Sequence, residues 1–208
     1  MAGWTELLTP ATLACGPAAA PADSGLRVLY DGGQTYTAFL AAARSRRADW
    51  LRNTAQATVD SALVARARAT GTGWRLLAVL EDGCSDSVNT IPYVAALVVA
   101  LGDAAALRLV NSAAGRPVMD THRTYDDRGA TPTVILLNAA GAEVGCWVER
   151  PTPLAEWTQA ERTRLSQAAF YEQKMAWYDR DRGRSTVEDI VRMLEGARPG
   201  APCLGNVR

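Results

Sequence analysis

Histidine and long apolar runs are scarce in this chain of 208 residues. It contains one histidine, 22 basic against 22 acidic groups, and four cysteines. A single histidine disfavours the His-rich zinc sites, so we expect no metal site and no cofactor. Zero net charge argues against a nucleic-acid or anionic-membrane partner, since such partners usually demand a basic patch. The longest apolar run, residues 93–101, is far shorter than the ~20 residues that span a bilayer.

The N-terminus also lacks the features of an export signal. No lysine or arginine precedes Arg27, and the Thr-Pro-Ala-Thr of residues 9–12 interrupts any apolar core. Residues 13–16 resemble a lipoprotein cleavage site only superficially. We therefore expect a cytoplasmic protein whose cysteines are reduced thiols unless one is catalytic. The only lysine is Lys174, which we attribute to a coding bias toward arginine.

Hydrophobic periodicity predicts one α/β domain. A strand, a crossover helix and a second strand predict a parallel pair, and a short connection at 138–141 predicts an antiparallel hairpin, so a mixed sheet with helices on both faces follows. The predicted elements are helices within 36–69, a strand over 74–80, a helix over 85–101, strands over 107–110, 133–137 and 143–148, and helices over 152–181 and 185–194. The expected organisation is a poorly ordered arm over 1–25, a domain over 26–196 (core 74–148, helical additions 35–70 and 152–196), and a flexible tail over 197–208.

Three local signals set the ends of the C-terminal helices. Thr152 is the predicted cap before Pro153 at a first helical position. Gly183 is expected to stop the first of these helices. The Ser-Thr-Val-Glu of residues 185–188 has the pattern of a capping box and is expected to open the final helix.

The segment Asp82 to Ser87 lies between a predicted buried strand and a predicted helix. Sites in open α/β sheets gather at the carboxyl ends of strands, so Cys84 is the candidate nucleophile. Free helix amides and the helix dipole favour its thiolate over its thiol. Ser87 could donate a hydrogen bond to that thiolate, whereas Asp86 disfavours a second negative charge nearby. Asp86 is interpreted either as a helix N-terminal carboxylate or as a proton-transfer group.

These residues resemble the active-site helix of the thioredoxin family, in which a Cys-x-x-Cys opens the helix. A proline follows the first cysteine of that family by eight residues, and Cys84 and Pro92 have this spacing. The Thr-Pro-Thr-Val-Ile-Leu of residues 131–136 resembles the family's cis-proline segment, which leads into an antiparallel hairpin. The resemblance implies a thioredoxin-like fold in which Thr131 and Pro132 lie against Cys84. Together with Gly83 they would bind an extended substrate strand.

The chain looks still more like a bacterial "thioredoxin family protein" group that carries helices on both sides of the core. Residues 81–87 look like that group's Glu-Asp-Trp-Cys-Gly-Asp-Ser. Segments 118–120, 149–151 and 177–184 are similar to its other signatures. With these segments the resemblance extends over most of the chain from residue 36 to residue 194.

Three positions depart from the redox pattern of the family. Ser87 replaces the second cysteine, so no disulfide can close within the motif. Gly83 replaces the tryptophan that usually precedes the nucleophile, and Ala78 stands where thioredoxins keep a buried aspartate. A two-cysteine reductase is therefore disfavoured. A monothiol cycle is still available, in which Cys84 attacks and an external thiol resolves the mixed disulfide.

Two functions follow from this interpretation. The leading hypothesis is a monothiol protein that acts on a protein or low-molecular-weight thiol or disulfide, by thiol–disulfide exchange or deglutathionylation. The alternative is a redox-silent thioredoxin-fold module that binds an extended segment of a partner. A glutathione-transferase-like enzyme would need a longer helical domain than the residues after Val148 provide.

The remaining cysteines and aromatic residues have simpler interpretations. Cys146 is expected to be a small buried hydrophobe, or alternatively a distant resolving thiol. A loose disulfide between Cys15 and Cys203, in the terminal arms, stays open. His122 is expected to be a surface or packing histidine. Arg44, Arg46 and Arg47 are expected on a solvated helix face, and the aromatic residues Trp157, Trp177 and Tyr178 in the core.

Overall fold

The computed structural model describes residues 23–205 of the chain. Its elements, in chain order, are α1 (Ser24–Gly32), α2 (Tyr36–Ala42), α3 (Arg47–Gln56), α4 (Ser61–Ala69), β1 (Trp74–Leu80), α5 (Ser85–Leu101), the 3-10 turn η1 (Gly102–Ala104), β2 (Ala105–Asn111), α6 (Arg116–Thr121), β3 (Thr133–Leu137), β4 (Glu143–Val148), α7 (Thr152–Glu161), α8 (Gln167–Asp181) and α9 (Arg184–Glu195). The strands predicted at 74–80, 133–137 and 143–148 therefore form with the expected bounds.

The strands form one mixed sheet in the order β2-β1-β3-β4. β1 and β2 are parallel, with Leu76 opposite Leu107, and α5 is the crossover between them. β3 is antiparallel to both β1 and β4, with Ile135 opposite Leu77 and Cys146. The β-α-β unit and the hairpin expected from the sequence are both present.

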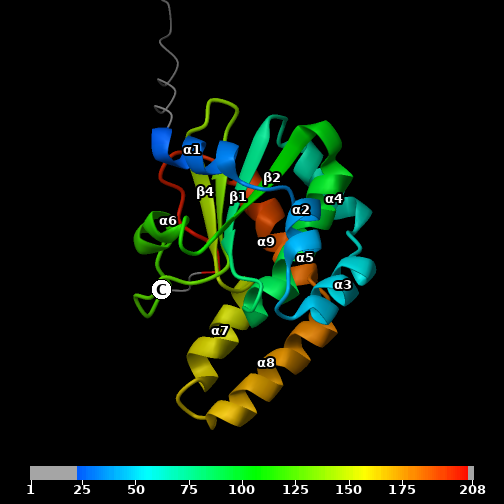
Figure 1. The fold of residues 1–208 in the computed structure, drawn as a ribbon, viewed down its shortest axis with the longest axis vertical. Coiled ribbons are helices and arrows are strands. Elements are labelled where there is room, and N and C mark those ends of the chain that lie inside the picture. The colour runs from blue at the N-terminus through cyan, green and yellow to red at the C-terminus, as the bar shows by residue number, and fades with distance from the viewer. Residues whose placement is uncertain (1–22, 206–208) are drawn as a thin grey trace, which may run out of the picture.

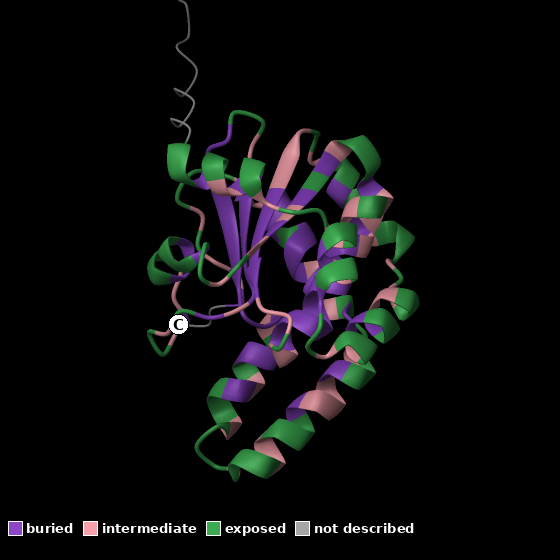
Figure 2. Ribbon diagram, viewed as in Figure 1, coloured by how far each residue is buried: buried purple, intermediate pink, exposed green. Residues whose placement is uncertain are grey.

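Two apolar clusters pack on opposite faces of this sheet. The larger contains Leu76 and Leu80 of β1 with side chains of α3, α5 and α9. The smaller contains Leu77 and Val79 with side chains of α1 and α6. Alternate residues of β1 thus face opposite layers, which explains its continuous apolar run. Figures 1 and 2 show the buried sheet between these helices, and α7 and α8 projecting from one end of the molecule.

α5 and η1 together form a stretch, Ser85–Ala104, that is long and apolar enough to cross a membrane. However, 61% of its most apolar window is buried inside the fold. The helix packs on the sheet and contacts α3 and α9, and α9 packs on the same face of the sheet. Its apolar character therefore has an explanation as a core helix.

The predicted helix over 152–181 is wrong, because the structure divides it into α7 and α8. Ser166 is the N-cap of α8, and its hydroxyl oxygen accepts a hydrogen bond from the Ala169 amide at 3.3 Å. This local capping competes with a continuous helix. The rings of Trp157 and Phe170 then stack across the helix pair, with centroids 5.1 Å apart.

Both predicted N-caps in this region are also wrong, because Thr152 binds a residue of a distant helix and Ser185 binds a residue four positions before it. Thr152 lies inside α7, and its hydroxyl donates to Asp189 of α9 at 3.0 Å. α9 begins one residue earlier than expected, after Gly183 as its N-cap. The Ser185 hydroxyl donates to Asp181 at 2.6 Å instead of making a capping box with Glu188.

Two further helices were not expected from the sequence. α1 begins at Ser24, within the segment expected to be a poorly ordered arm, and Asp23 caps its amides at 2.9 and 3.1 Å. α6 lies within the polar segment between β2 and β3. Residues 1–22 of the expected arm, Cys15 included, lie outside the described part of the chain.

The C-terminal segment differs from the expected flexible tail. Cys203 forms a disulfide with Cys146 of β4. Leu204 forms a parallel bridge with Trp147, its amide donating to the Cys146 carbonyl at 2.9 Å. The expectation of a free Cys146 thiol and the Cys15–Cys203 alternative are therefore both wrong. The predicted burial of Cys146 is correct, since its residue is 3% exposed.

Candidate active site

Cys84 follows the buried strand β1 and is the N-cap residue of α5. Its Sγ accepts a hydrogen bond from the Ser87 amide at 3.5 Å. The thiol also donates to the Thr131 carbonyl oxygen, 3.2 Å from Sγ. The side chain is partly exposed, and it is the one free cysteine within residues 23–205. The thiol therefore lies at the positive end of α5, within reach of solvent.

The segment facing Cys84 comes from the start of β3. The Thr131–Pro132 peptide bond is cis. Pro132 is buried, and its carbonyl accepts the Glu149 amide at 2.8 Å, while the Thr133 hydroxyl donates to the Ala130 carbonyl at 2.8 Å. These bonds hold the segment so that the Thr131 carbonyl reaches Sγ, 47 positions along the chain.

The loop before Cys84 is held by residues near the start of α3. The Asp82 carboxylate accepts the amides of Arg44 and Ser45, both at 2.9 Å, and these hydrogen bonds lower its pKa. Arg46 donates through Nε to the Gly83 carbonyl at 2.9 Å and through a second guanidinium nitrogen to the Tyr171 hydroxyl at 2.9 Å. The interpretation of Arg46 as a solvated helix face is therefore wrong.

Asp86 is a buried carboxylate two residues after Cys84, only 5% exposed. It accepts hydrogen bonds from Lys174 Nζ at 3.0 Å, the Tyr178 hydroxyl at 2.9 Å and the Arg150 guanidinium at 3.2 Å. Burial would raise its pKa, but the charges of Arg150 and Lys174 outweigh burial and hold the pKa below its usual value. Its negative charge thus opposes a thiolate at Cys84 less than an unpaired carboxylate would.

The Asp86 cluster extends to two neighbouring groups. Glu149 pairs with the Arg150 guanidinium at 2.8 Å and with Arg128 at 3.3 Å. Burial raises the pKa of Glu149, which the charge of Arg150 opposes only in part. Lys174 Nζ also donates to the Ser85 hydroxyl at 2.9 Å. The first turn of α5 is consequently bound to both β4 and α8.

Ser87 contacts Cys84 only through its backbone amide. The residue is fully buried, and its hydroxyl has no hydrogen-bond partner among the described residues. A side-chain hydrogen bond from Ser87 to a Cys84 thiolate is therefore a prediction for the ionised state.

The fold brings the site residues predicted from the sequence to one end of the sheet: Cys84, Asp86, Ser87, Thr131 and Pro132. The partners of Asp86 were not predicted, and they come from the segment after β4 and from α8: Arg150, Lys174 and Tyr178. Two signals were available. Lys174 is the only lysine of an arginine-rich chain. The other two fall in segments that resemble signatures of the bacterial group.

Comparisons with known proteins agree with this architecture. A protein of unknown function from Pseudomonas aeruginosa has a similar fold, with a TM-score of 0.64, 18% identity, and coverage of 81% of this chain and 95% of that chain. An HIV epitope scaffold has a TM-score of 0.64 and 19% identity, with coverage of 83% of this chain and 98% of that chain. No curated protein matches the chain. These two solved structures support the fold alone.

The family model described as thioredoxin matches residues 33–163. This range contains all four strands, Cys84 and the Thr131–Pro132 segment, whereas Lys174 and Tyr178 lie beyond it. The predicted α/β thioredoxin-like fold is confirmed. The chain belongs to the thioredoxin family.

Proposed function

We propose that Cys84 is the nucleophile of a monothiol thiol–disulfide exchange. The observation that carries the proposal is the position of Sγ, which accepts the Ser87 amide at the N-terminus of α5 and lies 3.2 Å from the Thr131 carbonyl. Helix amides and the positive end of the dipole favour a thiolate there, and the thiolate is the attacking species.

In the first step the Cys84 thiolate attacks one sulfur of a disulfide or of a glutathionylated thiol. A new S–S bond joins Cys84 to the substrate, and the other sulfur leaves as a thiolate, which takes a proton from water. An external thiol, as its thiolate, then attacks the mixed disulfide and releases Cys84. The backbone of Thr131, beside Pro132 and across from Gly83, would pair with an extended substrate strand.

The proposal of an external thiol rests on the cysteines within residues 23–205. Position 87 is a serine, and Cys146 and Cys203 are joined to each other. In this part of the chain Cys84 therefore has no resolving thiol. A protein or low-molecular-weight thiol in a cytoplasmic setting is therefore the proposed partner, and membership of the bacterial group described above is part of the same proposal.

A redox-silent binding module is the second candidate. The observation that favours it is the hydrogen bond from the Cys84 thiol to the Thr131 carbonyl, because a sulfur that donates is protonated. Such a thiol would cap α5 and hold the opposite segment, and the same groove would bind a partner strand without turnover.

The test measures the alkylation rate of Cys84 against pH in a Cys15→Ser background under non-reducing conditions. The Cys146–Cys203 disulfide is then intact, and Cys84→Ser gives the rate without the target thiol. A half-maximal rate near or below pH 7 supports the monothiol function. A thiol that stays unreactive up to about pH 8.5, the reference value for free cysteine, would leave the binding module.

A turnover assay complements the alkylation test. The parent is expected to remove glutathione from a glutathionylated peptide with free glutathione as the resolving thiol. Cys84→Ser is expected to lose this activity entirely, whereas Cys15→Ser retains it. Equal rates for the parent and Cys84→Ser would rule out the mechanism.

A further inference from the structure

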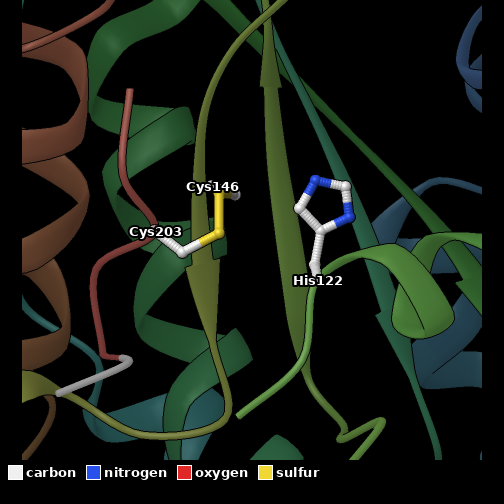
Figure 3. Close-up of side chains that lie close together, drawn as sticks. All are labelled: His122, Cys146 and Cys203. Carbon is white, nitrogen blue, oxygen red and sulfur yellow. A yellow bond between two sulfur atoms is a disulfide. The ribbon is translucent and has the colours of Figure 1, made fainter. Parts of the chain in front are cut away.

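A second group of sulfur and nitrogen atoms lies away from Cys84. His122 follows α6, Cys146 belongs to β4, and Cys203 belongs to the C-terminal segment. One potential ligand atom from each lies within 4.8 Å of the other two. Figure 3 shows the imidazole of His122 beside the disulfide. Cys146 packs on the sheet face covered by α1 and α6, opposite the face on which α5 packs.

The surroundings of His122 fix the roles of its two ring nitrogens. Nδ1 is 2.8 Å from the Val118 carbonyl oxygen, which can only accept, so Nδ1 carries a proton. Nε2 is 2.8 Å from Oε1 of Glu143. A backbone carbonyl on one nitrogen is the arrangement that orients a metal-binding histidine, because the other nitrogen is then aimed at the metal. Nε2 becomes available to a metal when it releases its hydrogen bond to Glu143.

The Cys146–Cys203 disulfide bears on metal binding, because thiolates are the sulfur ligands of zinc. A dithiol reductant would supply two electrons and two protons, break the S–S bond, and itself become a disulfide. Once that bond is broken, rotation of the two side chains can separate the sulfur atoms, while the backbone bonds of Leu204 keep the segment beside β4. Two thiolates about 2.3 Å from a shared ion require such a separation.

We propose that reduction of the Cys146–Cys203 disulfide by an external dithiol creates a zinc site. The ligands are the thiolates of Cys146 and Cys203 and Nε2 of His122, the three residues whose ligand atoms lie within 4.8 Å of one another, with a water molecule in the fourth position. Zinc displaces the two thiol protons and the proton between His122 and Glu143. Two thiolates and one imidazole suit tetrahedral zinc, whereas magnesium and calcium prefer oxygen ligands alone.

The test uses a Cys15→Ser/Cys84→Ser background, so that Cys146 and Cys203 are the only cysteines. The protein is reduced with a phosphine, freed of reductant without oxygen, and titrated with cobalt(II). We expect one equivalent to bind with an intense near-ultraviolet thiolate-to-cobalt band, and zinc to displace cobalt. The oxidised protein is expected to give no such band.

Variants then separate this site from unspecific binding. Cys203→Ser and His122→Gln are each expected to weaken zinc binding by at least about tenfold, whereas Asp120→Asn, an exposed neighbour, leaves it unchanged. Circular dichroism of the reduced protein records whether it stays folded. The proposal is overturned if the reduced protein binds no more metal than the oxidised one. It is equally overturned if His122→Gln binds zinc as tightly as Asp120→Asn. That result is expected of an unfolded chain, in which the two thiols bind zinc without His122.

Discussion

Asp86 is a charged carboxylate in the interior, with two cations and a phenol within 3.2 Å. Such a group is stable only while its partners stay in place, because an uncompensated buried charge is costly. It binds Lys174 and Tyr178 of α8 and Arg150 after β4, and so fixes the first turn of α5 that carries Cys84. At this scale Asp86 positions the first turn of α5, and its role in proton transfer stays a prediction.

Asp86→Asn is expected to lower the free energy of unfolding at pH 7 by about 3–5 kcal/mol, because Lys174 and Arg150 lose their buried counter-charge. Urea titration measures this loss. Asp127→Asn is the matched control, since that aspartate side chain is 86% exposed and its paired arginine is half-exposed. It should change stability by less than about 0.5 kcal/mol. Similar losses in both variants would contradict the assigned role of Asp86.

The difference in unfolding free energy between the parent and Asp86→Asn is expected to depend on pH. The pKa of Asp86 is lowered in the folded state, so its stabilisation is present above the unfolded carboxyl value of about 3.9. It is lost as the pH falls through the lowered folded value. The stability difference between the parent and Asp86→Asn should therefore be constant near neutral pH and shrink below about pH 4. A difference that grows on acidification would exclude this linkage.

At the scale of elements, the junction of α8 and α9 depends on one glycine. Gly183 has φ +73°, and a Cβ there would lie 2.0 Å from Cγ of Tyr93 in α5. The tyrosine is 2% exposed, so its ring cannot move away easily. This close approach lets α9 cover the face of the sheet on which α5 packs. A residue with a side chain at position 183 could not come so close to Tyr93.

The loss of unfolding free energy in Gly183→Ala, compared with that in Gly200→Ala, tests this packing. Gly200 has φ +70° and open space around its Cβ position, so alanine there meets only the backbone penalty of about 1–2 kcal/mol. Gly183→Ala should cost roughly a further 1–3 kcal/mol through overpacking. Chemical denaturation of both variants measures the difference. Equal losses would assign the whole effect to backbone strain.

At the scale of the whole molecule, the helical additions and the sheet share one core. The larger apolar cluster joins Trp50 of α3 and Leu76 of β1 with Ile190 of α9. The Trp147 indole of β4 donates to Asp189 of α9 at 3.1 Å, and the same carboxylate binds Thr152. Neither addition can therefore separate from the sheet without exposing apolar surface.

A single cooperative unfolding transition is expected for the chain. The transition followed by tryptophan fluorescence, to which all six tryptophans contribute, including Trp50 and Trp147 in the core, should coincide with the transition followed by far-ultraviolet circular dichroism, which reports mainly on the helices. Both are followed in one urea titration of the oxidised protein. Two separated transitions would mean that a helical addition unfolds independently.

The strands and the place of Cys84 at the start of a helix were predictable because they depend on local patterns. The apolar run of β1 and the spacing from Cys84 to Pro92 are visible in the sequence alone. Helix boundaries were less predictable, because Thr152 binds the distant Asp189 and Ser185 binds Asp181 at the end of α8, and neither caps its own helix. A capping residue gives the same sequence signal whichever partner its side chain binds.

The sequence by itself determined the order of the strands, the α/β class and the absence of a second cysteine beside Cys84, since these are properties of adjacent residues. Only the tertiary structure decided which distant residues meet. It joined Cys146 to Cys203, placed His122 beside them, and surrounded Asp86 with Lys174 and Arg150. The disulfide and these ion pairs link residues 57 to 88 positions apart, and no local pattern encodes them because each depends on how the sheet and helices pack.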